Sequence, residues 1–207
     1  MMLPASRADA ARKSLGFMTL EETAALADRG VIVPDPGSTL VSAEVSLGGG
    51  VVLWPNTILQ CSAGGAIGIG SGTFIYPGTR IVAQGGRVTI GPGAEIGEEG
   101  GFTIHAVGGS ITHLGSGVRL LGGGSLTGSN TLGDGAQVLG PIRCRSCILG
   151  GGGTHREPDP DRRGGVLKGS GVARDIEVPQ GHVIQSFDVF AEAPIRRQSF
   201  FHRKQPE

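Results

Sequence analysis

A motif of four residues recurs five times in the first two thirds of the chain. Each copy reads aliphatic residue, glycine, any residue, glycine, and successive copies begin 22, 21, 24 and 18 residues apart, at Leu47, Ile69, Ile90, Leu114 and Leu132. Six residues after each start stands a further aliphatic side chain, at Leu53, Ile75, Ile96, Leu120 and Val138. A period near 20 residues is typical of repeat architectures, in which each unit stacks on the next.

The long period divides into steps of six residues. The last full repeat and its continuation show them best, at Leu114, Leu120, Leu126, Leu132, Val138 and Cys144. A step of six fits neither the ~3.6-residue turn of an α-helix nor an isolated strand. It fits a coil with three flat faces, one hexapeptide on each face and about 18 residues in each turn. Residues in excess of this number then form loops at corners, near Gly64, near Gly85 and at 98–103.

Two other folds explain the sequence less well. The 39 glycines among 207 residues would suit a disordered linker, but such a linker lacks periodic aliphatic positions and a hydrophobic content of 38%. A β-sandwich would show turns that are less regular than these. The few aromatic residues agree with a narrow interior, and we expect Phe187, Phe190, Phe200 and Phe201 to pack outside the coil, against a neighbouring turn or subunit.

The N-terminal region has helical signals. Thr19 and Glu22 have the spacing of a capping box, and Gly30 is a natural helix end. Residues 6–15 predict a second helix, and both helices are expected to cap the first turn of the coil. We therefore predict a helical cap over 1–37, a β-helix over 38–184 with a loop insertion at 150–165, and an irregular C-terminal tail over 185–207.

The hexapeptide pattern resembles the left-handed β-helix, or hexapeptide-repeat, acyltransferase-like family. Residues 30–59 are similar to the start of the β-helix in the bifunctional bacterial N-acetylglucosamine-1-phosphate uridyltransferase/glucosamine-1-phosphate acetyltransferases. The resemblance covers about residues 20–140, and residues 172–181 resemble the end of many hexapeptide acyltransferase coils. It implies an all-β fold, a single-stranded left-handed parallel β-helix, with a short N-terminal helical segment.

The same resemblance implies a function. Family members transfer an acyl group from acetyl-CoA or another acyl-CoA to an amino sugar or a small hydroxyl or amine acceptor. The acceptor would bind between neighbouring coils of a homotrimer, and CoA would lie along the last turns, near Lys168 and Arg174. The alternative is a non-catalytic β-helix, a scaffold or assembly module related to sugar-nucleotidyltransferase β-helix domains, because the best match is to the first turns and fold does not determine function.

Catalytic candidates lie where the repeat is interrupted, because loop residues are not committed to packing. The loop at 150–165 is the most charged stretch of the chain and contains His155, Arg156, Glu157 and Asp159. Hexapeptide acyltransferases use a histidine in such a position as general base, and histidine titrates near neutral pH. We predict that His155 is the catalytic base, that Glu157 and Asp159 orient it, and that these two carboxylates and Arg156 bind the acceptor.

A second candidate base is His113. The pair His113-Leu114 resembles the His-Leu pair that contains the base in the bifunctional enzymes. In those enzymes the pair lies about one turn before a Gly-Thr, whereas His113 lies 41 residues, about two turns, before Thr154. The tyrosine and lysine that neighbour the pair in the family are also missing, and the only tyrosine is Tyr76. For both histidines the alternative is an exposed corner residue with no catalytic role.

No metal site is predicted. Cys144 and Cys147 form a single C-x-x-C pair, whereas a structural zinc site needs four ligands, and Cys144 falls on an inward position of the six-residue pattern. His105, His113 and His155 do not reproduce the histidine spacing of the γ-class carbonic anhydrases, which share the β-helix fold. The glycine motifs lack the Lys-Ser/Thr of a phosphate loop.

Charge and hydropathy predict the partners and the location. The 18 basic and 18 acidic residues balance, so no net charge attracts nucleic acid or an anionic membrane. The sequence has no apolar run of membrane-spanning length and no signal-peptide pattern, and its three cysteines are an odd number, which together predict a cytoplasmic protein. Outward apolar residues such as Val52, Ile58 and Val82 would be wet on a lone coil, which favours a homotrimer.

Overall fold

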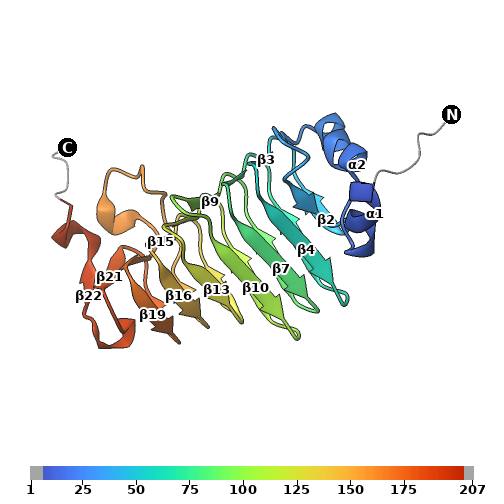
Figure 1. Ribbon diagram of the computed structural model, residues 1–207. Helices are drawn as coiled ribbons and strands as arrows, with labels where there is room; N and C mark the ends of the chain where they lie inside the picture. The colour runs from blue at the N-terminus through green and yellow to red at the C-terminus, as the bar shows by residue number, and fades with distance from the viewer. Residues whose placement is uncertain (1–6, 203–207) are drawn as a thin grey trace.

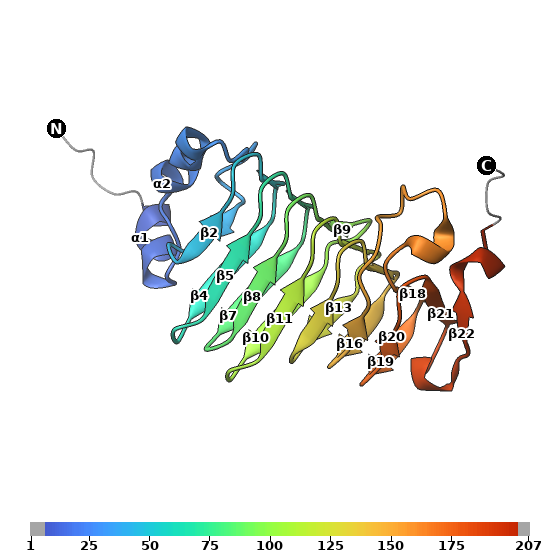
Figure 2. The same cartoon turned by 180° about the vertical axis from the view of Figure 1, so that it is seen from behind.

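The computed structural model describes residues 7–202 and shows a parallel β-solenoid (Figures 1 and 2). The chain winds repeatedly around one axis, and successive turns place their strands side by side in three sheets. The α-helices lie at one end of the solenoid and the C-terminal segment lies at the other. The expected all-β fold of stacked parallel strands is confirmed, and its left-handed sense stays a prediction. None of the helices in the described part of the chain is long and apolar enough to cross a membrane.

Each sheet takes every third strand of the solenoid, and the third sheet also includes one antiparallel strand at the C-terminal end. Sheet 1 contains β1 (Leu40–Val41), β4 (Ile58–Ser62), β7 (Arg80–Gln84), β10 (Thr103–Val107), β13 (Ser125–Thr127), β16 (Ile142–Arg145) and β19 (Gly171–Arg174). Sheet 2 contains β2 (Val45–Leu47), β5 (Ala66–Ile69), β8 (Arg87–Ile90), β11 (Ile111–Leu114), β14 (Asn130–Leu132), β17 (Ile148–Leu149) and β20 (Glu177–Val178). Sheet 3 contains β3 (Val52–Leu53), β6 (Phe74–Ile75), β9 (Glu95–Glu98), β12 (Arg119–Leu121), β15 (Gln137–Leu139), β18 (Val166–Gly169), β21 (His182–Ser186) and β22 (Ile195–Arg197).

The strand register places the predicted aliphatic positions in one stack inside sheet 3. The residues pair directly across successive turns and are fully buried: Leu53, Ile75, Ile96, Leu120 and Val138. Because side chains alternate along a strand, the residues on either side of each stack member point outward. The predicted register is therefore confirmed, and it also fixes which side chains line the outer face.

The two glycines of each motif are required for different physical reasons. In the copy that starts at Ile69, a Cβ added to Gly70 would lie 2.5 Å from the backbone nitrogen of Pro92 on the next turn. Gly72 needs no such space but has a φ of +65°, a left-handed conformation that side chains with a Cβ rarely adopt. The first glycine thus permits close stacking of turns, and the second permits the corner.

The N-terminal helices close the first turn. α1 (Arg7–Ser14), α2 (Leu20–Ala24) and the 3-10 helix η1 (Ala25–Arg29) are present, and the capping box of α2 is confirmed by bonds of 3.1 Å from Glu22 N to Thr19 Oγ1 and 2.8 Å from Thr19 N to Glu22 Oε2. The buried Arg12 of α1 donates to the carbonyl oxygens of Pro36 (2.7 Å) and Thr39 (3.0 Å). These bonds fix the cap to the chain that enters the first strand.

The C-terminal segment closes the last turn, and here the expectation for Phe190 is wrong. Phe190 begins the 3-10 helix η3 (Phe190–Glu192), is 0% exposed and belongs to the hydrophobic core. The ring fits because no further turn occupies the open end of the solenoid. Beyond η3, β22 pairs antiparallel with β21, and the 3-10 helix η4 (Gln198–Phe200) follows. Phe187 and Phe200 lie outside, as expected.

Two of the outward residues that favoured a trimer are covered by their own chain. Val52 is 8% exposed and Val82 is 5% exposed in the single chain. Because they are already buried in the single chain, these two residues no longer support a homotrimer. The exposed apolar residues lie elsewhere, and they include Ile32, Trp54 and Phe74 near the N-terminal end of sheet 3.

Candidate functional site

The polar loop at 150–165 is folded on itself and closed at its base. Gly153 N donates to the carbonyl oxygen of Arg162 (2.8 Å), and Gly164 N donates to that of Gly153 (2.9 Å). Within the loop lies the 3-10 helix η2 (Pro160–Arg162), whose N-cap Asp159 accepts a bond from Asp161 N (3.0 Å). The loop therefore has a defined shape and returns the chain to β18.

The C-terminal segment is bound to this loop. Gln198 is buried, and its Nε2 donates to the carbonyl oxygen of Gly164 (2.7 Å). Ser199 N donates to Asp161 Oδ1 (3.0 Å). These contacts join two segments that lie far apart in the sequence, and they place both beside the last strands of sheet 3.

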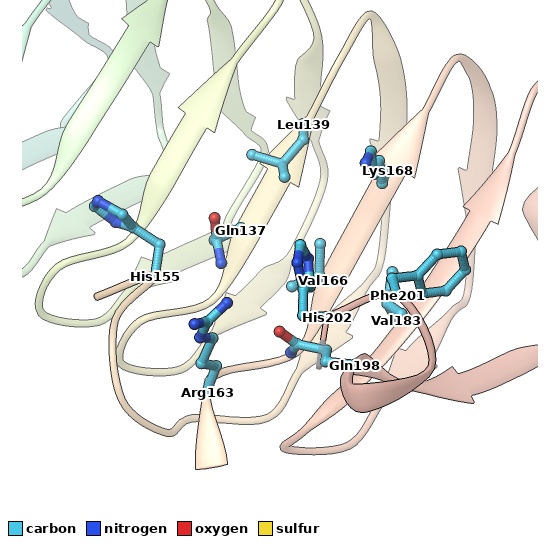
Figure 3. A pocket seen from close by; sticks show the side chains of 10 residues that line it. All are labelled: Gln137, Leu139, His155, Arg163, Val166, Lys168, Val183, Gln198, Phe201 and His202. Carbon is cyan, nitrogen blue, oxygen red and sulfur yellow. The ribbon is translucent and has the colours of Figure 1, made fainter. Parts of the chain in front are cut away.

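A cavity of about 190 Å³ lies between the two segments and the outer face of sheet 3 (Figure 3). Its floor consists of outward side chains from β15, β18 and β21: Gln137, Leu139, Val166, Lys168 and Val183. Its walls come from the loop and the C-terminal segment: His155, Arg163, Gln198, Phe201 and His202. The cavity combines an apolar floor with a few polar and basic groups, which is the usual composition of a small-molecule site.

His155 lines this cavity and also a second, smaller hollow. The second hollow is lined by Gly93, Glu95, Gly117, Thr154 and Arg156 in addition to His155. Partial burial lowers the pKa of His155 below its ordinary value, Arg119 lowers it further, and Glu95 opposes the shift. The imidazole is therefore neutral near pH 7 and has a free lone pair to accept a proton.

Arg119 and two carboxylates form a charged cluster, and Arg119 and Glu95 of this cluster act on the pKa of His155. Arg119 extends from β12 to Glu98 (2.6 Å from Nη2 to Oε2) and to Glu95 (3.1 Å from Nε to Oε2), both on β9. The Nε contact is an ion pair without a good hydrogen-bond angle, because this buried nitrogen makes no hydrogen bond. Burial and both carboxylates raise the pKa of the nearby Tyr76.

The structure brings several of the predicted site residues together. His155 and Arg156 share the smaller hollow, and Lys168 lies on the floor of the larger cavity. Glu157 and Asp159 make contacts within the loop: Glu157 Oε1 accepts from Asp159 N (3.3 Å), and Asp159 caps η2. The carboxylate that raises the pKa of His155 is Glu95.

Other predicted site residues lie on different faces. His113 is exposed on the outer side of β11 in sheet 2, and Arg174 is exposed on β19 in sheet 1. Because His155 and Lys168 belong to the outer side of sheet 3, the fold does not bring His113 to His155. For the same reason, it does not bring Arg174 to Lys168.

Sequence reasoning named only two of the ten residues that line the cavity as site residues, His155 and Lys168. The six-residue step aligns Gln137 with Val166 and Val166 with Val183, so the floor was within reach of the pattern. The pattern could not predict the walls, because the positions of Arg163 and His202 depend on how the loop and the C-terminal segment pack against each other.

The cysteines are buried and reduced. Cys144 and Cys147 lie inside the solenoid, which confirms the inward position expected for Cys144. Within residues 7–202, no three His, Cys, Asp or Glu side chains are close enough to hold a metal ion. Metal-free chemistry stays a prediction.

A comparison of the chain with protein-family models and with curated proteins gives no match.

Proposed function

We propose that the protein transfers an acyl group from an acyl-CoA to a small hydroxyl or amine acceptor, such as an amino sugar, with His155 as general base. The observation that carries this proposal is the position of His155, a neutral imidazole between two hollows at the outer face of sheet 3. The parallel β-solenoid is compatible with the hexapeptide-repeat acyltransferases.

In the proposed step, the acceptor occupies one side of His155 and the thioester occupies the other. The neutral imidazole takes the proton of the acceptor O–H or N–H as that atom attacks the carbonyl carbon. The C–S bond then breaks, and the CoA thiolate leaves and takes up the proton from His155. Arg156 contacts the acceptor in the smaller hollow, where it lies beside His155.

The size of the cavity limits what part of the donor enters it. A volume of about 190 Å³ is below that of sites for drug-sized ligands, so only the acyl end of an acyl-CoA fits inside. Lys168 lies on the floor and is exposed, which suits contact with the donor. Arg174 lies on sheet 1 and is left out of the proposed donor site.

A homotrimer is part of the proposal, with the acceptor lying near a second copy. Ile32 and Phe74 lie on either side of Val52 in the strand register of sheet 3, and both are exposed, as is the neighbouring Trp54. A second copy packed on these side chains would remove them from water. Light scattering tests this: a mass near 21.1 kDa, that of one chain, would contradict the trimer.

The test of the acyl transfer is the release of free CoA from acetyl-CoA, followed with a thiol reagent over a panel of amino sugars. The chain's own cysteines are buried, so the folded protein contributes little background. His155→Ala should lower the rate by about 100-fold or more, because general-base catalysis contributes about 10² to 10⁴. His113→Ala is the matched control on another sheet and should leave the rate unchanged.

A separate measurement asks whether CoA binds. A saturating ligand at about 100 times its Kd adds about 2.7 kcal/mol of apparent stability, which a thermal-shift experiment detects. If acetyl-CoA gives no shift and no acceptor of the panel supports CoA release, the acyltransferase proposal is wrong. The non-catalytic scaffold would then be the better hypothesis.

A further inference from the structure

We infer that the 190 Å³ cavity is a binding site for a small organic anion, with its oxyanion at Arg163 and Lys168 and its apolar body on the floor of sheet 3. In the proposed acyl transfer the same cavity receives the acyl end of the donor, so a bound anion would compete with the donor there. As a binding site it stands on the geometry of the cavity alone.

The charges that line the cavity have one sign. Arg163 and Lys168 are basic, and His155 and His202 add two imidazoles. Among the described residues that line the cavity, none is an aspartate or a glutamate. A chain with balanced total charge has therefore placed two basic residues and no acidic residue in the lining of one small hollow, which favours an anionic ligand.

Arg163 has hydrogen-bonding capacity to spare. Its Nε donates to the carbonyl oxygen of Glu157 (2.7 Å), which fixes the guanidinium in the loop. Within residues 7–202 its two terminal amino groups have no hydrogen-bond partner and no ion pair. Figure 3 shows the guanidinium directed towards the cavity and Gln137. A fixed guanidinium fork with free amino groups is suited to two parallel bonds with a carboxylate or phosphate.

Gln137 adds an uncharged hydrogen-bonding group to the cavity. The residue is only 6% exposed, and its side-chain amide makes no hydrogen bond to any part of the chain between residues 7 and 202. The amide is accessible from the cavity that it lines, so it is available to a ligand there. The Gln137 NH₂ group can donate to the same oxyanion as Arg163.

The remaining floor is apolar and sets the rest of the ligand's chemistry. Leu139, Val166 and Val183 point outward from adjacent strands, and Phe201 covers them from the C-terminal segment. These side chains favour a short hydrocarbon body over a fully hydrated inorganic ion. The ligand class is therefore a small carboxylate or phosphate monoester with an apolar part.

Ligand charge should also act on His155. The charged groups that affect this imidazole are Arg119 from β12, Glu95 from β9, and Arg156 and Arg163 from its own loop. A bound anion adds negative charge in the cavity that His155 lines, so it should raise the pKa of His155. By linkage the anion should then bind more tightly as the pH falls through the titration of His155.

Isothermal titration calorimetry without any acyl donor tests the inference. The probes are butyrate, its neutral amide butyramide, and propyl phosphate, which share a short chain and differ in the head group. We expect at least one of the two anions to bind at least about tenfold more tightly than butyramide, because charge-assisted hydrogen bonds are about twice as strong as neutral ones. The two anionic arms distinguish a carboxylate site from a phosphate site.

Three substitutions locate the site. Lys168→Gln and Arg163→Gln should each weaken the preferred anion at least tenfold, and Gln137→Leu should weaken it without changing the charge. If Arg163→Gln disturbs the loop, Lys168→Gln still tests the site, because Lys168 is exposed on a strand and its replacement should not alter the fold. The matched control is Arg145→Gln, which removes an exposed arginine on sheet 1 and should leave the affinity unchanged.

Two results would overturn the inference. One is equal affinity for butyrate, propyl phosphate and butyramide, or binding of none of them. The other is an affinity that falls as much in Arg145→Gln as in Lys168→Gln. Neither result bears on CoA release, which is measured separately, so failure of the anion site and failure of the proposed acyl transfer are distinguishable.

Discussion

The last turns of sheet 3 differ from the same turns of sheets 1 and 2 only on the outside. Inside, all three sheets stack fully buried aliphatic residues such as Leu126, Leu132 and Val138. Outside, the strands of sheets 1 and 2 present exposed side chains such as Arg145 and Ile148. Sheet 3 is instead covered by the loop and the C-terminal segment, which enclose the cavity.

This difference shows how a repetitive fold acquires a site. The repeat fills its interior uniformly, so it leaves nothing there for a ligand. A flat outer strand gives too little enclosure to shield polar groups from water. The hollow forms where two non-repeating segments cross the same sheet. It brings together the neutral His155, the terminal amino groups of Arg163 and the side-chain amide of Gln137.

The largest expected effect tests the uniform interior. Leu120→Asp would bury a carboxylate without a partner, because Leu120 is fully buried between Ile96 and Val138. We expect a loss of more than about 4 kcal/mol, enough to unfold much of the solenoid. Leu121→Asp is the matched control, since the next side chain points outward and is partly exposed. Equal thermal stability of Leu120→Asp and the wild type, measured by circular dichroism, would refute the register.

The next effect tests the C-terminal segment as a cap. Phe190→Ala should cost about 3–5 kcal/mol, because it leaves a cavity where the ring closes the open end of the core. Phe187→Ala removes a ring that is 74% exposed and should change stability by no more than about 0.5 kcal/mol. Denaturant titration measures both, and similar losses in the two variants would argue against a buried Phe190.

A smaller effect tests the wall of the cavity. Gln198→Ala removes the bonds to the carbonyl oxygens of Gly164 (2.7 Å) and His182 (3.4 Å), at a cost of about 1–3 kcal/mol. The loss should be local, with faster amide hydrogen exchange in residues 195–202 and in the loop while the sheets remain protected. The control is Gln185→Ala, a partly exposed glutamine on β21. Unchanged exchange in Gln198→Ala would mean that the two segments do not depend on this side chain.

The smallest effect concerns the charge of His155. Its pKa in the folded protein lies below the ordinary 6.5, so the unfolded chain binds the proton more readily. Stability should therefore fall as the pH drops below about 6.5 and stop falling once the folded protein is also protonated. Titration of the His155 ring by NMR measures the folded pKa directly. A midpoint at or above 6.5 would contradict the neutral base.

Arg119→Gln sharpens the same measurement. It removes a positive charge that lowers the pKa of His155, and it frees Glu95, which raises it. Both changes act in one direction, so the midpoint should rise. Arg145→Gln on the uncovered sheet 1 should leave the midpoint where it is, and a rise of the same size there would show that the effect is not local.

The uniform interior and the cavity on sheet 3 also differ in how well the sequence predicts them. The interior was predictable because each buried position obeys one local rule, an aliphatic side chain every six residues, and Leu120 and Val138 fall where the rule places them. The rule failed for Phe190, because an end of the solenoid has no next turn and therefore has more room. His155 stood out by composition, as a histidine in the most charged interruption of the repeat.

The sequence by itself thus determined the parallel stacking, the register and the outward direction of Gln137, Val166 and Lys168, since strand alternation follows from the local pattern. Only the tertiary structure decided that His155 lies over these residues and that His113 and Arg174 lie on other sheets. The reason is that the walls depend on long-range hydrogen bonds, such as Gln198 to Gly164 and Ser199 to Asp161, which no periodic rule encodes.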